Sequence, residues 1–245
     1  MTSLLAWHGT RADGTTRHLK IKEVVGVKTF LVGNVELCSN ALHGSIRAVD
    51  MLQYSEGLWI KRTLHEGVVL HDTNKIGSSE RTVIGEADAT QVVVNWAFWC
   101  ADRAVRIHAV AALRQAGMNI EAEKLVGLEA IADKKSALAA SNAGNAIRAA
   151  AFNAGNAIRA AAFNAGNAVR AAAFYSADAV RAAAFYAAYD AVRAAADAAA
   201  DAAGHAANTA AAYDAANAVE MEFLNAELER RLLALMGLTE TEVIQ

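Results

Sequence analysis

Histidine and cysteine offer the most reactive side chains in this sequence, and His43 is the most prominent of them. It lies between a predicted strand and a predicted helix, where an imidazole can bind a ligand or can satisfy a backbone group through one ring nitrogen. We favour the structural role and keep ligand binding as the alternative. Cys38 and His43 could also combine with His65 or His71 around a metal ion. That set matches no metal-finger spacing and lacks a fourth ligand, so we expect no metal site.

No catalytic motif accompanies these residues. Cys38 or Cys100 could be paired on paper with any histidine, yet no local pattern supports a Cys–His or Ser–His–Asp arrangement. We therefore expect a protein that is not an enzyme and that needs no cofactor. The two cysteines show no CxxC spacing and fit a reducing compartment, and the N-terminus lacks the features of a secretory signal. A cytoplasmic location is expected.

Composition divides the 245 residues into parts of different kind. Mixed, glycine-containing sequence gives way near Asp88 to a region dominated by alanine, in which Arg or Asn recurs too often for a membrane span. The net charge of −3 and the sparse arginines argue against nucleic-acid binding. We expect an α+β protein with a small domain over residues 1–88, a linking helix over 89–118, an alanine-rich helical region over 119–209, and an amphipathic helix and tail over 210–245.

The elements that must position His43 are short runs rich in β-branched residues and separated by turn residues. One helix is predicted within residues 45–54, where Ser45 can cap the first turn and Ile46, Val49 and Leu52 share a face. The order β-β-α-β-β-β favours a small, mostly antiparallel sheet with one helix packed on it. The predicted strands cover residues 18–25, 29–37, 57–64, 67–72 and 81–87.

The string LCSNALHGSIRAVDMLQYSEG, followed by GVVLHDTNKIGSSERTVI, resembles an uncharacterised domain family found in tailed bacteriophages and prophages. The resemblance covers residues 18–100, and Ala41 stands where the family usually has glycine. Members often join this domain to alanine-rich repeats, so the resemblance implies a phage-encoded protein in the bacterial cytoplasm. The places of the family pattern are held here by Cys38, Leu42, His43, Asp50, Leu52, Tyr54, Lys75 and Arg81.

The same segment is similar to ADP-ribosyltransferase-like folds, in which a glycine-flanked strand and a helix ending in Tyr help to bind a nicotinamide nucleotide. Leu42, His43, Ala48 and Tyr54 fit that pattern, whereas no catalytic Glu emerges. Together the two resemblances imply that His43, Tyr54 and Arg81 bind a ligand.

Three further helices are predicted. The first covers residues 91–116 and ends at Gly117, and its Trp96, Phe98 and Trp99 are expected to pack against the sheet. A second begins after Asn119, which can cap it, and is expected to run on into the repeats. The last covers residues 210–236 and is closed by Gly237. It could cap the domain or form a short oligomerisation seam.

The repeats begin with NAGNAIRAAAF at Asn142 and recur every eleven residues, into a tract that extends to about residue 218. Glycine at the third position of the unit could mark a β-solenoid corner, but Ala177 replaces it in the fourth copy, so we expect helix. An eleven-residue period favours a right-handed supercoil. Two rows of side chains, aliphatic and aromatic, should be covered by other helices in hairpins or in a homo-oligomeric bundle or coiled coil. The predicted interface residues are Ile147, Phe152, Ile158, Phe163, Val169, Phe174, Val180 and Phe185.

Two functions follow from these patterns. The first is a non-enzymatic phage-type accessory protein that self-assembles and binds a host or phage protein, in host interaction or counter-defence. The alternative is a small-ligand or nucleotide-binding protein whose N-terminal domain resembles ADP-ribosyltransferases and whose helices form an oligomerisation scaffold.

Overall fold

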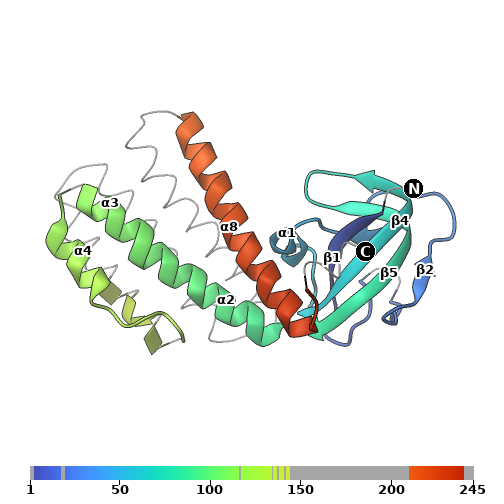
Figure 1. Cartoon of the computed structure of the whole chain (residues 1–245), viewed down its shortest axis with the longest axis horizontal. Helices are drawn as coiled ribbons and strands as arrows, with labels where there is room; N and C mark the ends of the chain where they lie inside the picture. Colours follow the sequence, from blue (N-terminus) through green and yellow to red (C-terminus); the bar gives the residue numbers. More distant parts are fainter. Residues whose placement is uncertain are drawn as a thin grey trace. The chain divides into compact units, whose positions relative to one another are not determined.

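The computed structural model shows an antiparallel sheet and helices, in two compact units (Figure 1). One unit comprises Met1–Val92 together with Asn225–Gln245, and the other comprises Val93–Leu224. Nothing in the sequence indicated that the C-terminal segment Asn225–Gln245 joins the first unit. The structure describes residues 3–17, 20–115, 117–133, 135–136, 138–140, 142–143 and 210–239.

The first unit is built on a long hairpin of β4 (Trp59–His71) and β5 (Ile76–Asp88). β1 (Leu4–Thr10) pairs with β4, whereas β2 (Lys28–Phe30) and β3 (Leu42–Gly44) pair with successive stretches of β5. All of these pairings are antiparallel. The strand order is therefore β1-β4-β5-β2. β3 also pairs with β5, just before the stretch of β5 that pairs with β2.

The sheet curls so that β1 also meets the chain that follows β3. The Trp7 amide donates to the Ser45 carbonyl oxygen at 2.7 Å, and the Ser45 amide donates back to the Trp7 carbonyl oxygen at 2.8 Å. Hydrogen bonds thus link β1, β4, β5 and β3 in a closed path. Residues on both faces of β1 are covered at least in part, so its burial pattern lacks the simple alternation of a strand with one face in solvent.

Several sequence-based strand assignments need correction. The predicted strands 57–64 and 67–72 are one strand, β4, whose register shifts between Glu66 and Val69. Gly67 lies at this bulge with φ +73°, a backbone conformation that favours glycine, so the turn residue produces a bulge rather than a break. The predictions for 18–25 and 29–37 were largely wrong, since Lys28–Phe30 is the strand of that region. β1 and β3 were not predicted.

The helix α1 (Ala48–Leu52) confirms the helix predicted within residues 45–54, but its capping differs. Arg47, rather than Ser45, occupies the N-cap position and gives no side-chain cap. The free amides are satisfied from α8 (Ala210–Met236): Ala48 donates to Glu229 Oε1 at 3.1 Å and Val49 to Asn225 Oδ1 at 3.1 Å. A segment near the C-terminus therefore fixes the start of α1.

The second unit contains the helix predicted over residues 91–116. It is composed of α2 (Thr90–Arg103), a π-helical segment (Ala104–Ala109) and α3 (Val110–Gln115), and Gly117 follows with φ +78°. The next helix, α4 (Asn119–Val126), begins at Asn119 rather than after it, and Met118 holds the cap position. Residues 127–133 are not helical, so the predicted continuation of α4 into the repeats is wrong.

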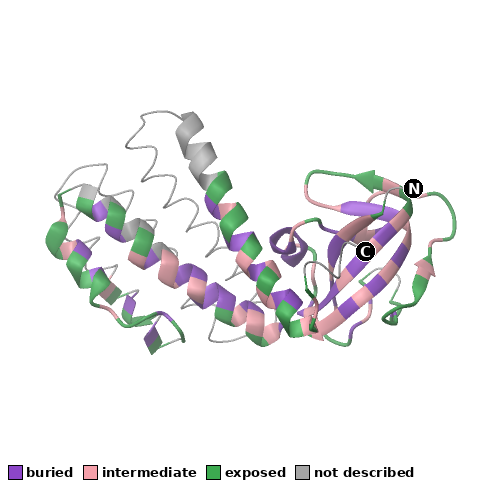
Figure 2. Ribbon diagram, viewed as in Figure 1, coloured by how far each residue is buried: buried purple, intermediate pink, exposed green. Residues whose placement is uncertain are grey.

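The buried residues of the second unit (purple in Figure 2) include one apolar cluster. Phe98 on α2, Leu113 on α3 and Leu125 on α4 belong to it. Trp96 is fully buried, and its indole N–H donates to the Leu224 carbonyl oxygen at 3.1 Å. These two aromatic residues are buried, but Phe98 packs among helices, whereas the sequence placed it against the sheet. The helix predicted over 210–236 is confirmed as α8, and Gly237 follows it with φ +68°.

Two further sequence-based expectations concern the repeats and the membrane. The repeats from residue 144 onward, and with them all the predicted oligomer-interface residues, lie outside the described residues. Among the residues that are described, no helix is long and apolar enough to cross a bilayer.

Candidate ligand-binding site

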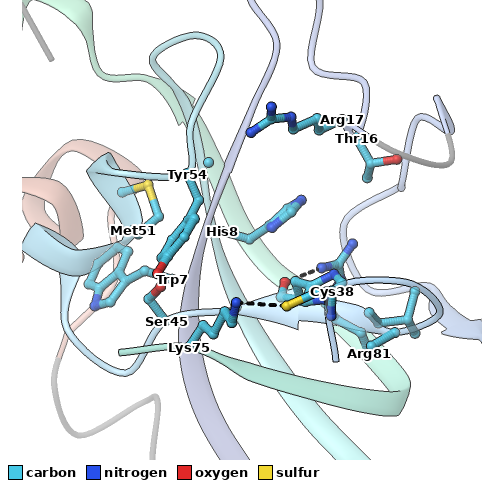
Figure 3. Close-up of a pocket in the computed structure, with 15 residues that line it drawn as sticks. Trp7, His8, Thr16, Arg17, Cys38, Ser45, Met51, Tyr54, Lys75 and Arg81 are labelled. Carbon is cyan, nitrogen blue, oxygen red and sulfur yellow. Dashed lines mark hydrogen bonds between the residues drawn. The ribbon is translucent and has the colours of Figure 1, made fainter. Parts of the chain in front are cut away.

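A cavity of about 290 Å³ lies in the first unit where β1, β3 and β5 come together (Figure 3). β1 contributes Trp7 and His8, β3 contributes Leu42 and His43, and β5 contributes Arg81. The segments around these strands complete the lining with further side chains. Those that matter for the argument below are Arg17, Cys38, Tyr54 and Lys75.

The three residues predicted to bind a ligand all line this cavity. His43 lies on β3, Tyr54 follows α1, and Arg81 lies on β5. They are far apart in the sequence, and β3 is brought next to β5 by the pairing of Leu42 with Ser78. The tertiary structure therefore gathers the predicted residues at one place.

His43 has the structural role that the sequence favoured, although the bond differs from the expected one. Its Nε2 atom accepts a hydrogen bond from the Cys38 amide at 3.1 Å. Its own backbone carbonyl oxygen accepts a hydrogen bond from the Arg81 guanidinium. His43 thus ties the Cys38 turn to β5 and shapes the wall of the cavity.

Arg81 is held by a buried carboxylate. Its guanidinium donates to Glu23 Oε1 with N–O distances of 2.7 and 2.8 Å, and Arg81 is only 2% exposed. Lys61 Nζ lies 3.7 Å from Glu23 Oε2 and 3.3 Å from Glu86 Oε2. Burial lowers the pKa of Arg81, and the opposing charge of Glu23 limits that change. A buried cluster of charges thus lies behind the cavity wall.

His8 was missed by the sequence reasoning and occupies a central place in the cavity. Its Nε2 atom is shielded from solvent and has no hydrogen-bond partner among the described residues. Burial first, and then the positive charge of Arg81 and its neighbours, lowers the pKa of His8 well below its ordinary value. The imidazole is therefore neutral at pH 7. A buried polar atom without a partner costs free energy in a folded protein.

One corner of the cavity combines a thiol, an ammonium group and an aromatic ring. Lys75 Nζ lies 2.9 Å from Cys38 Sγ and 5.6 Å from the centre of the Tyr54 ring (Figure 3). The hydrogen bond to Cys38 is the main cause that raises the pKa of Lys75. The Tyr54 hydroxyl donates to Asn74 Oδ1 at 2.6 Å, which holds the ring beside the β4–β5 turn. The sequence pattern contained Cys38 and Lys75 but gave no reason to join them.

The metal arrangement considered from the sequence does not form. His65 instead bonds Thr63 Oγ1 at 3.0 Å and Ser78 Oγ at 2.8 Å within the core. Within the described ranges, no three His, Cys, Asp or Glu side chains come together as metal ligands do.

The charge of the lining is one-sided. Arg17, Lys75 and Arg81 contribute positive charge, and the described residues of the lining include no carboxylate. Arg17 and Arg81 are paired with carboxylates just outside the lining, at 2.9 and 2.7 Å. Lys75 has a weaker partner in Asp72, at 3.6 Å. Lys75 is therefore the cation best placed to meet an anionic ligand.

Comparison of the chain with protein-family models, curated proteins and solved structures finds no significant match.

Proposed function

We propose that the first unit binds a small, planar, anionic ligand of the nucleotide class in the cavity between β1, β3 and β5. The observation that carries the proposal is His8, which lines a cavity bordered by cations and by no described carboxylate and whose shielded Nε2 atom has no partner among the described residues. Such convergence of a few polar groups in an otherwise apolar pocket is typical of ligand sites.

The chemistry of the lining favours this ligand class. The Tyr54 ring is 38% exposed and can stack on a planar base, while the nearby Lys75 ammonium can meet a phosphate or carboxylate. His8 Nε2 can bond a hydroxyl, amide or ring nitrogen of the ligand. The volume of about 290 Å³ is near the lower end for small-molecule sites, which favours a mononucleotide or half of a dinucleotide.

The experiment is a ligand panel on the full chain, followed by thermal unfolding and by titration calorimetry. NAD, adenosine phosphates, a cyclic nucleotide and inorganic phosphate are the probes. A ligand present at 100 times its Kd should stabilise the protein by about 2.7 kcal/mol. His8→Gln and Lys75→Gln should each weaken binding by about tenfold or more, since each removes one polar contact of about 1.5 kcal/mol.

Two exposed residues outside the lining provide matched controls. His71→Gln, at the end of β4, and Lys124→Gln, in α4, make the same chemical changes away from the cavity and should leave binding unchanged. A panel without any thermal shift, or equal losses in the controls and the cavity variants, would refute the proposal.

The repeat pattern supports a second proposal, that the alanine-rich tract acts as a self-assembling scaffold in a phage-type accessory protein that binds a host or phage protein. The supporting observation is the aromatic row of Phe152, Phe163, Phe174 and Phe185, which recurs every eleven residues. Light scattering should report a defined homo-oligomer, and Phe163→Ser with Phe174→Ser should dissociate it. A monomeric wild-type protein would contradict this proposal and leave the ligand site unaffected.

A further inference from the structure

The two cysteines of this chain lie in opposite environments. Cys38 is exposed, lines the cavity and touches Lys75, whereas Cys100 on α2 is buried with none of its surface exposed. Cys100 therefore serves as an internal control, because the reactivity of an exposed and of a buried thiol can be compared in the same molecule.

Cys38 is held in place by its backbone. The Glu36 amide bonds the Asn40 carbonyl oxygen at 2.7 Å and the Asn40 amide bonds the Glu36 carbonyl oxygen at 2.9 Å, which closes a tight turn around Cys38. The Cys38 amide is fixed by His43 Nε2, and the residue has φ +72°. The sulfur is thus presented to Lys75 by a closed turn rather than by a free loop.

Lys75 supplies a positive charge in direct contact with the sulfur. The Nζ–Sγ distance is 2.9 Å, so the ammonium lies within hydrogen-bonding distance of the sulfur atom at which an exchange would take place. The contact with Cys38 raises the pKa of Lys75, so the ammonium keeps its charge at neutral pH. Its carboxylate partner, Asp72, is farther away at 3.6 Å and is half exposed.

The cavity beside the sulfur also contains a buried polar group. His8 lines the same cavity as Cys38 (Figure 3), and its shielded Nε2 atom has no partner among the described residues. A group attached to Cys38 would therefore enter the cavity that His8 lines.

We propose that Cys38 is a site of reversible modification by low-molecular-weight disulfides of the glutathione type, and that Lys75 is the positioning residue that keeps its sulfur reactive. The Cys38 thiolate attacks one sulfur of the disulfide and forms a new S–S bond as the old one breaks. The other half leaves as a thiolate and takes a proton from water. Cys38 is oxidised, and the departing half of the disulfide is reduced.

The modification should also close the ligand site, a consequence that rests on the proposed nucleotide binding. The adduct would fill the cavity from the Cys38 side and break the contact between the sulfur and Lys75. The Lys75 ammonium would then face the adduct instead of a phosphate. The first unit would bind its ligand under reducing conditions and release it when disulfides accumulate.

The modification is tested on the full chain with oxidised glutathione and intact-mass spectrometry. One reversible adduct is expected, on Cys38, and none on Cys100 until the protein is denatured. Cys38→Ser should abolish the adduct and Cys100→Ser should retain it. Two adducts in the folded protein, or one on Cys100, would overturn the assignment.

The role of Lys75 is tested by the rate of adduct formation. Lys75→Met should slow the reaction by about three- to tenfold, and Lys75→Arg should recover most of the rate, because the charge beside the sulfur is restored. Rates measured in denaturant correct for any loss of folding, since all variants should then react alike. Equal rates for the folded wild type and Lys75→Met would show that Lys75 has no such role.

The effect of the modification on nucleotide affinity is measured separately, by nucleotide titration of the reduced and the modified protein. Modified protein should show at least about tenfold weaker binding, with recovery after reduction. Unchanged affinity would refute closure of the site. If the reduced protein binds no nucleotide, the proposed function and the closure fail together, while the mass measurement still decides the modification.

Discussion

The two units of this protein differ in how deeply they bury charge. The first unit encloses Glu23, Lys61 and Arg81 in a cluster of charges. The second unit packs an apolar cluster around Phe98, Leu113 and Leu125. Its ion pairs are less deeply buried: the side chains of Arg103 and Glu220 are 21% and 8% accessible, and those of Arg114 and Glu123 are 52% and 64% accessible. Burial of charge costs free energy that apolar packing does not, so the first unit maintains an arrangement that stability alone would not favour. The proposed ligand site belongs to the unit that carries this cost.

The largest difference between the units should come from removing one charge in each. Glu23→Ala leaves Arg81 and Lys61 buried without their carboxylate, and we expect a loss of about 3–5 kcal/mol in the free energy of unfolding. Glu123→Ala removes an exposed partner of Arg114 and should cost less than about 1 kcal/mol. Urea denaturation of the two variants measures both values. Similar losses would contradict the contrast between the units.

The apolar core of the second unit should respond to loss of volume. Leu113→Ala leaves a cavity at a buried position and should lower the free energy of unfolding by about 2–5 kcal/mol. Leu138→Ala, at a residue that is 54% exposed, is the matched control and should change stability by less than about 0.5 kcal/mol. Chemical denaturation gives both numbers. If the two variants were equally stable, the cluster around Leu113 would not be the core of this unit.

Acid should destabilise the first unit through its neutral histidines. Burial, with nearby positive charge, lowers the pKa of His8 and of His65 well below the ordinary value of 6.5. Between the folded and unfolded pKa values the unfolded chain binds more protons, so stability is full above about pH 6.5 and falls on acidification below it. Each histidine contributes at most about 1.4 kcal/mol per pH unit.

The measurement is urea denaturation of the wild type and of His65→Gln between about pH 7.5 and about pH 5. The variant loses hydrogen bonds to Thr63 and Ser78, so its absolute stability will fall, and the slope with pH is the informative quantity. We expect a shallower slope in the variant. An identical slope would show that protonation of His65 is not linked to unfolding.

A further comparison concerns one glycine in each unit. A Cβ atom at Gly9 would lie 2.3 Å from Ser55 Oγ and 2.7 Å from Met51 Sδ, so Gly9→Ala should cost about 1–3 kcal/mol. Gly127 has φ −75° and its nearest atom at 3.5 Å, so Gly127→Ala should stabilise by about 0.4–1 kcal/mol. Thermal unfolding gives the sign of each change. Destabilisation by both substitutions would show that the close approach at Gly9 is not special.

The elements that could be predicted are those with a strong local signal. Regular apolar spacing located α8 and the helix that begins at Thr90, and glycine marked the residue after each. β1 was missed because residues on both of its faces are covered at least in part, so Trp7 and its neighbours show no alternating pattern. β3 has only three residues, Leu42–Gly44, too few for any periodicity.

The sequence by itself determined the longer helices and the region of β4 and β5, because apolar periodicity and turn residues act over a few residues. Its resemblances to known folds suggested His43, Tyr54 and Arg81. Only the tertiary structure decided that these residues share a cavity with His8, and that Lys75 touches Cys38. It also decided that Glu229 and Asn225 complete the start of α1. The reason is physical: hydrogen bonds and charge pairs between distant residues depend on how strands pair and helices pack, and no spacing along the chain records that arrangement.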